Sequence, residues 1–249
     1  MNILMVLRLS IKEKNEIEAF VKNNYSLNKI ATILGKSKTT IYYHFLKLRG
    51  KTIKKLKITT VDEELIGEFI GLFCGDGCLD KTSDYKYRIY LFFNVKEKYL
   101  VDKIIENSLK KLFSKKPMVF RNRNVITICF YSKVIKDLIH DYLTWDLNFK
   151  KTYTVHLRAQ SQTKNFMIGF LRGSIDSDGH ISKNKIVFAS VSYYLIQDIM
   201  YFLEKLDISH NLYEYIEKRK NRKPIYHIYI KKNHYQKFID TIKPRKLGT

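Results

Sequence analysis

The chain has 249 residues, enough for two or three domains, and its 45% apolar and 14% aromatic content excludes a disordered protein. Lys and Arg number 46 against 24 Asp and Glu, and the net charge of +22 indicates a polyanionic partner such as nucleic acid. A general enrichment in lysine is the alternative source of this charge, but it does not explain why acidic residues fail to keep pace.

The number of cysteines and the length of the apolar stretches indicate the cellular compartment of the protein. Three cysteines, an odd number, argue against a disulfide framework and for a reducing environment. No stretch approaches the roughly 20 apolar residues of a membrane span, and the first residues do not form a signal peptide. We therefore expect a cytoplasmic protein of prokaryotic origin with no membrane partner.

Residues 1–60 carry 13 Lys and Arg residues and three acidic residues. Ser10 and Glu13 form a capping-box pattern that predicts a first helix, and Ser26 predicts the start of a second. Gly35 marks a tight turn, and a third helix is predicted after Ser37.

Three short helices with this turn resemble a helix-turn-helix DNA-binding domain over residues 1–50, followed by a basic linker over residues 51–60. A small three-helix packing module is the alternative. If the resemblance holds, the side chains that point toward a DNA major groove are Lys38, Thr39, Thr40, Tyr42, Tyr43 and His44.

The rest of the chain contains a duplication. Residues 66–79, IGEFIGLFCGDGCL, align with residues 168–181, IGFLRGSIDSDGHI. After each copy, strand-like and helix-like segments follow in the same order, so each repeat is predicted to be αββαββα. We expect an α+β fold of two repeats, residues 61–157 and 158–249, related by a pseudo-twofold axis.

Four glycines recur at four-residue spacing within the two copies: Gly67, Gly71, Gly169 and Gly173. A glycine inside a helix costs about 1 kcal/mol relative to alanine, so their presence needs a reason. Because each pair lies on one helix face and lacks side chains, two helices could approach closely along these faces. Their C-terminal ends would then bring Asp76 and Asp178 to one place.

Two carboxylates beside the unsatisfied carbonyls of two helix ends concentrate negative charge. Carboxylate and carbonyl oxygens are the ligands that a hard divalent cation such as Mg²⁺ prefers. The alternative is that each Asp-Gly pair is only a helix C-cap. The same frame in both copies favours a metal site.

The two stretches resemble the paired motifs of the LAGLIDADG homing endonucleases, with one motif over residues 69–77 and the other over residues 171–179. The resemblance covers residues 61–249. It implies a site-specific endonuclease for double-stranded DNA that serves intron homing, uses Mg²⁺ with Mn²⁺ as a substitute, and leaves staggered 3′ ends. It also implies a monomer with internal pseudo-twofold symmetry.

By this resemblance, the catalytic, metal-binding acids are Asp76 and Asp178, and the residues before them, Gly75 and Ser177, offer backbone carbonyls to metal. A basic residue near each metal would correspond to Lys151 and Lys246, which follow the last helix of each repeat; ordinary solvated lysines are the alternative. The chain departs from the motif at two positions: Cys74 replaces its first Asp, and Arg172 occupies a position that is usually small.

The sheets of the two repeats are expected to form a saddle that binds DNA. Strand alternation places Lys86, Arg88 and Tyr90 on one face. Hairpin tips add donors for phosphates and base edges, namely Arg121, Arg123, Arg219 and Arg222. Because aromatic residues occupy both faces of the strands, alternation leaves open which face meets DNA.

Two other functions are compatible with the same resemblance: a non-cleaving transcription regulator and an RNA-splicing maturase. Both aspartates are retained, which argues against the regulator but not against the maturase. An intein is not expected, because the ends carry neither a nucleophile at residue 1 nor a terminal Asn.

Overall fold

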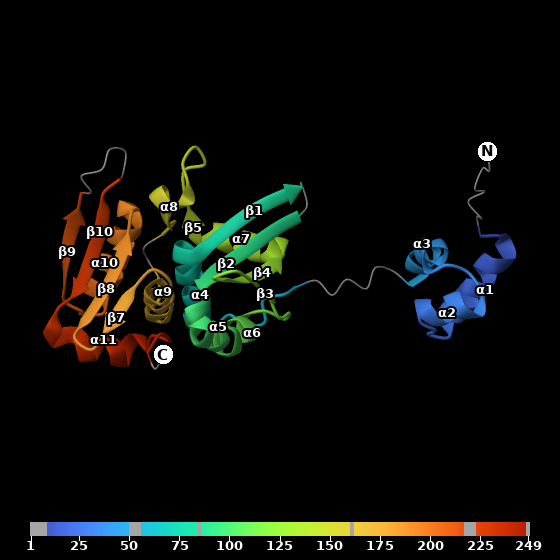
Figure 1. The fold of residues 1–249 in the computed structure, drawn as a ribbon, viewed down its shortest axis with the longest axis horizontal. Helices are drawn as coiled ribbons and strands as arrows, with labels where there is room; N and C mark the ends of the chain where they lie inside the picture. Colours follow the sequence, from blue (N-terminus) through green and yellow to red (C-terminus); the bar gives the residue numbers. More distant parts are fainter. Residues whose placement is uncertain (1–8, 50–55, 84–85, 160–161, 217–222, 248–249) are drawn as a thin grey trace. The chain divides into compact units, whose positions relative to one another are not determined.

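The computed structural model describes residues 9–49, 56–83, 86–159, 162–216 and 223–247 (Figure 1). The chain divides into two compact units, Met1–Lys55 and Leu56–Thr249, and each has its own apolar core. No helix in the described ranges is long and apolar enough to cross a membrane.

The N-terminal unit consists of α1 (Ile11–Lys22), α2 (Leu27–Ile33) and α3 (Lys38–Arg49). The Ser10–Glu13 capping box is present, and Gly35 adopts the left-handed backbone (φ +59°) that the turn before α3 requires. Its core is formed by Ile17, Ile30, Ala31, Ile41 and Phe45. The predicted three-helix architecture is confirmed.

The second unit begins inside the predicted linker. Leu56 is buried, the Thr59 amide donates a hydrogen bond of 2.9 Å to the Leu112 carbonyl, and Ile58 forms a bridge with Phe113. Residues 56–60 therefore belong to the second unit, which shortens the linker from the boundary predicted above. Residues 51–55 lie outside the described residues.

The second unit contains two αββαββα repeats, as predicted. The first comprises α4 (Glu63–Asp76), β1 (Gly77–Ser83), β2 (Lys86–Asn94), α5 (Lys98–Ile104) with its continuation through Ile105–Leu109 to α6 (Lys110–Leu112), β3 (Met118–Asn122), β4 (Val125–Tyr131) and α7 (Lys133–Tyr142). The connection to the second repeat holds β5 (Leu143–Thr144), α8 (Lys151–Thr154) and β6 (His156–Leu157).

The second repeat comprises α9 (Lys164–Ser177), β7 (His180–Ser182), β8 (Lys185–Ser190), α10 (Tyr193–Lys205), β9 (His210–Tyr215), β10 (Ile225–Ile230) and α11 (Tyr235–Ile242). The two sheets are antiparallel and have corresponding strand orders, β1-β2-β4-β3 and β7-β8-β10-β9. The same topology in both sheets matches the duplication in the sequence.

Helices α4 and α9 stand side by side between the two sheets (Figure 1). The four glycines face the neighbouring backbone: a Cβ atom at Gly71 would lie 2.8 Å from the Ser174 nitrogen, and one at Gly173 would lie 2.6 Å from the Leu72 nitrogen. Ordinary contacts of a Cβ atom are 3.4–4 Å, so any larger residue would push the helices apart. Arg172 does not prevent this approach.

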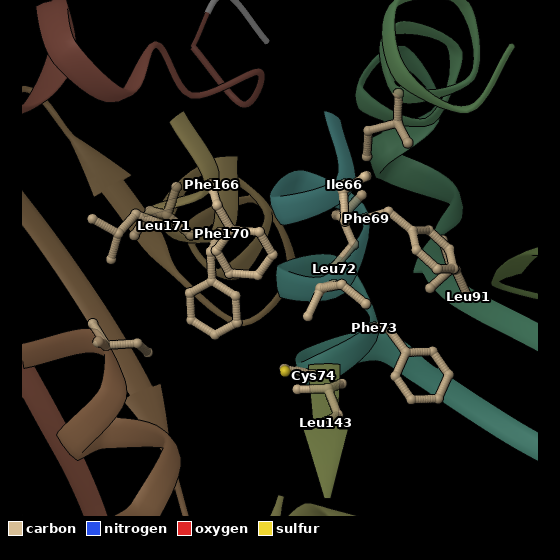
Figure 2. Packing of buried hydrophobic residues seen from close by; sticks show 14 of the residues in the cluster. Ile66, Phe69, Leu72, Phe73, Cys74, Leu91, Leu143, Phe166, Phe170 and Leu171 are labelled. Atoms are coloured by element: carbon tan, nitrogen blue, oxygen red, sulfur yellow. The ribbon is translucent and has the colours of Figure 1, made fainter. Parts of the chain in front are cut away.

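Large apolar side chains on the other faces of α4 and α9 join the helix pair to the sheets and outer helices (Figure 2). The ring of Phe69 meets that of Phe113 with centroids 5.1 Å apart, and the ring of Phe170 meets that of Phe202 at 5.4 Å, both edge to face. This core fixes the position of both helix ends.

Candidate active site at the paired helix ends

The ends of α4 and α9 bring the two motif aspartates into one region. Asp76 is the last residue of α4, and Asp178 caps α9. A Cβ atom at Gly75 would lie 2.9 Å from the Asp178 carboxylate oxygen Oδ2 and 2.8 Å from the Ser177 Cβ. The absent side chain at Gly75 therefore lets the second motif approach the residue that precedes Asp76.

The surroundings make both carboxylates harder to ionise. Burial raises the pKa of Asp76 to about 7, and the negative charges of Asp178 and Glu97 add to the effect, while Lys246 and Lys151 oppose it. Burial also raises the pKa of Asp178, although part of this residue is exposed to solvent, and the same two lysines oppose the shift. A cation bound between the two carboxylates would favour their ionised forms.

The lysine side chain of the first half-site lies at the end of α4. Lys151, the first residue of α8, donates hydrogen bonds from Nζ to the carbonyls of Phe73 (2.5 Å), Cys74 (2.8 Å) and Gly75 (3.4 Å). These carbonyls lie in the last turn, where a helix offers unsatisfied acceptors and partial negative charge. Burial lowers the pKa of Lys151, and nearby acidic groups oppose the shift.

Lys246 occupies the corresponding place at the end of α9. Its Nζ donates hydrogen bonds of 3.0 Å to the carbonyls of Ser177 and Gly179, and it lies 3.5 Å from Glu97 Oε1. Each half-site thus combines an aspartate, the carbonyl of the preceding residue and a lysine ammonium group. The structure brings together all six residues that the sequence assigns to this chemistry.

The two lysines are held in different ways. Buried Asp176 accepts hydrogen bonds of 2.9 Å from the backbone amides of Arg245 and Lys246, which fixes the segment that carries Lys246. Burial raises the pKa of Asp176 to about 6, and these two hydrogen bonds oppose the shift. Cys74 occupies the equivalent position of the first motif. Burial raises the pKa of its thiol to about 12.

A buried ion-pair network beside the helix pair was not expected from the sequence. Glu68 is fully buried on α4 and accepts hydrogen bonds from Arg172 (3.3 Å) and from Arg245 Nη2 (2.7 Å). Arg172 also pairs with Glu64 at 2.6 Å and donates to the Ile242 carbonyl at 2.7 Å. The sequence does contain an indication of this network: Glu68 is a charged residue within an otherwise apolar helix, and a charge that is buried requires a partner.

The residues predicted to contact DNA are partly described. On α3, Lys38, Thr39, Tyr42 and Tyr43 are exposed, whereas Thr40 and His44 are partly buried, with the Thr40 hydroxyl 2.8 Å from Ser37 Oγ. In the first sheet, Arg88 pairs with Asp80 at 2.9 Å, and Arg121 and Arg123 are exposed around the β3–β4 turn. Arg219, Arg222 and the side chain of Lys86 lie outside the described part of the chain.

The donor atoms at the helix ends suit a hard divalent cation. Within the described ranges, no group of three or more His, Cys, Asp or Glu side chains converges, so the side-chain ligands at the helix ends are the two aspartates. The two aspartates and the helix-end carbonyls are all oxygen donors, the set that Mg²⁺ and Ca²⁺ accept together with water.

Comparison with known proteins agrees with this arrangement. Residues 165–243 match the family described as a LAGLIDADG-like domain. The matched residues run from the first turn of α9 to the end of α11, within the second repeat. Residues 7–45, which hold α1, α2 and most of α3, match the family described as a helix-turn-helix domain.

Solved structures of homing endonucleases have the same fold over a range that is long enough to include both repeats. The homing endonuclease I-DmoI in complex with DNA and Ca is 16% identical, with 74% of this chain and 91% of that chain covered at a TM-score of 0.55. Its complex with DNA and Mn is 15% identical, with 72% and 96% covered, also at 0.55. At these identities the likeness establishes a shared fold.

A sequence relative has a much longer chain. The replication factor C small subunit of Methanocaldococcus jannaschii is 28% identical over 188 residues. The match covers 72% of this chain and 9% of that protein, so the chain spans less than a tenth of the length of this curated relative.

Proposed function

We propose that the chain is a site-specific endonuclease that hydrolyses both strands of double-stranded DNA with a divalent metal. The observation that carries this proposal is the repetition of one set of groups at both helix ends: Asp76 or Asp178, the carbonyl of the preceding residue, and Lys151 or Lys246. Two equivalent half-sites in one rigid helix pair suit a substrate with two antiparallel strands, each cut once.

Asp76 and Asp178, with the carbonyls of Gly75 and Ser177, would hold the cation, for which Mg²⁺ is the preferred ion and Mn²⁺ a substitute. When bound, the metal would activate water and stabilise the negative charge of the phosphate. The side-chain nitrogens of Lys151 and Lys246 lie one at each half-site, where an ammonium group would stabilise the leaving oxygen. Their hydrogen bonds to helix-end carbonyls orient both ammonium groups.

The N-terminal unit would add a second DNA contact. Its helix α3 exposes Lys38, Thr39, Tyr42 and Tyr43, and the chain as a whole carries a charge of +22. A tethered second module raises affinity through its effective concentration, without altering the chemistry of the first. The I-DmoI structures with DNA and with Ca or Mn support both the DNA substrate and the metal requirement.

The test is metal-dependent cleavage by the full chain. The protein is incubated with a plasmid library of randomised inserts in Mg²⁺, Mn²⁺ or EDTA, and the cut ends are sequenced. The proposal predicts cuts at a defined site in Mg²⁺ or Mn²⁺ and none in EDTA. The matched control is the Asp76→Asn, Asp178→Asn double variant, which should bind the same site without cutting it.

Two results would contradict the proposal. Cleavage that persists in the double variant would assign the nuclease activity elsewhere. Tight DNA binding by the wild-type protein with no cleavage in either metal would assign a non-cleaving DNA-binding function to this fold.

A further inference from the structure

The outer face of the first sheet is rich in apolar groups. Strand alternation directs Ile89, Leu91 and Phe93 into the core, so the alternate residues of β2 face outward. Their ladder partners on β1 and β4, and the β3 residues paired with those of β4, share this face. The described side chains of this outer face are Cys78, Asp80, Arg88, Tyr90, Phe92, Asn94, Met118, Phe120, Asn122, Val125, Thr127, Cys129 and Tyr131.

Several of these apolar side chains are open to solvent. Phe92, Phe120 and Tyr131 are 39%, 45% and 57% exposed, and the rings of Tyr90 and Phe92 stack with centroids 5.7 Å apart. Tyr90, Phe92 and Phe120 also line an open depression of about 700 Å³, together with Asn122 and Thr127. A contiguous exposed apolar patch of this kind marks an interaction surface.

Side chains that recognise guanine are few among the described residues of this face. Arginine and lysine recognise guanine through its O6 and N7 atoms, whereas asparagine recognises adenine through N6 and N7. Among the described side chains of the outer face, the one arginine is Arg88, which is paired with Asp80. Asn94 and Asn122 share the face, and Arg123 lies at the rim of the depression, in the β3–β4 turn.

The second sheet repeats this chemistry. The described side chains of its outer face, which alternate with the core residues of β7 to β10, are His180, Ser182, Lys185, Val187, Ala189, Asn211, Tyr213, Tyr215, Ile225, His227 and Tyr229. The rings of Tyr213 and Tyr229 meet at 5.3 Å, and Lys185 Nζ lies 4.9 Å from the Tyr229 centroid. Aromatic rings again outnumber cations among the described residues.

We infer that the two outer faces recognise A·T-rich double-stranded DNA, through contacts between their apolar side chains and the C5-methyl groups of thymine. The inference rests on the proposed function and takes the saddle of the two sheets, expected from the sequence, as the DNA surface. The thymine methyl is the one apolar group that base pairs present in the major groove, and that groove admits a β-ribbon. The charge of +22 of the chain as a whole supplies attraction to phosphates.

The test removes the methyl groups and nothing else from the DNA. Binding of the full chain to the alternating duplexes poly(dA-dT), poly(dA-dU) and poly(dG-dC) is measured at fixed salt in EDTA, so that cleavage plays no part. We expect poly(dA-dT) to bind most tightly. Affinity for poly(dA-dU) should be lower by about fourfold for each methyl group lost from the interface.

Two variants test whether the outer sheet face is responsible for the difference in affinity between poly(dA-dT) and poly(dA-dU). The Phe92→Ala, Phe120→Ala double variant should lose most of the difference between poly(dA-dT) and poly(dA-dU). The matched control is Tyr99→Ala, which removes a ring that is 51% exposed on α5 and is not part of either outer sheet face. It should keep the full difference.

Three results would overturn the inference while leaving the proposed function in place: equal affinity for poly(dA-dT) and poly(dA-dU), tighter binding of poly(dG-dC), or full methyl discrimination in the double variant. Tighter binding of single-stranded poly(dT) than of any duplex would also overturn it, because the rings would then be stacking on unpaired bases. Binding to none of these DNAs would contradict the proposed function itself.

Discussion

The close contact between α4 and α9 can be tested by replacing Gly173 with leucine. A Cβ atom at this position would lie 2.6 Å from the Leu72 nitrogen, whereas an ordinary contact begins at 3.4 Å. The Glu68 carbonyl oxygen lies closer still, so the helices would have to separate by roughly 0.8 Å or more for the Cβ atom alone, and further for the rest of the side chain. Because backbone atoms form the contact, no side-chain rotation can relieve it.

The expected magnitude follows from two opposing effects. Overpacking costs about 1–3 kcal/mol, occasionally more, and leucine places four heavy atoms against a backbone, so we expect the upper end or beyond. Leucine regains somewhat less than 1 kcal/mol of helix propensity relative to glycine. The free energy of unfolding should fall by about 2 kcal/mol or more, which lowers the melting temperature of this unit by roughly 4–8 °C or more.

Thermal unfolding followed by circular dichroism measures this change. The matched control is Asn165→Leu in the first turn of the same helix, an exposed position where the change should stay within about 0.5 kcal/mol. If Gly173→Leu melts at the wild-type temperature, the two helices do not pack through the glycine face.

Three further predictions concern the half-sites and the N-terminal unit. Asp176→Ala removes both acceptors that hold the backbone of Arg245 and Lys246, so cleavage of one strand should slow and nicked DNA should accumulate; equal slowing of both strands would refute this half-site role. Without metal, stability should fall as pH rises from about 4 to 7, because the folded state raises the pKa of Asp76 to about 7 and so binds protons more tightly than the unfolded chain. This slope should shrink in Asp76→Asn and in saturating Mg²⁺, and a pH titration of melting temperature that shows the same slope in all three would contradict it. A chain beginning at residue 56 should still cut DNA but bind it with lower affinity and a shallower dependence on salt, and an unchanged salt slope would show that the first unit does not bind DNA.

Local patterns predicted much of this fold. The Ser10 capping box and the Gly35 turn determine where helices begin and end within a few residues, so they can be read without knowing tertiary contacts. The duplication around Asp76 and Asp178 predicted both the paired helices and the convergence of two carboxylates, because equivalent segments take equivalent places in a pseudo-twofold structure.

Contacts between distant segments could not be predicted in the same way. The hydrogen bonds from Arg245 and Lys246 to Asp176 join residues about 70 positions apart, and no periodicity records such a contact. The partners of Glu68 and the start of the second unit at Leu56 also depend on tertiary packing. The outward face of the sheet became assignable only when the burial of Ile89 was known, since alternation alone treats both faces alike.

Strand-resolved cleavage measures the activity of the two half-sites separately. A target duplex labelled differently on its two strands is incubated in Mg²⁺ with the wild-type protein, Asp76→Asn or Asp178→Asn, and binding is measured in parallel. Two metal-dependent half-sites predict double-strand cuts by the wild type and loss of cleavage of at least one strand in each single variant, with binding retained. Double-strand cutting at the wild-type rate by either variant would show that the substituted aspartate is not needed for cleavage.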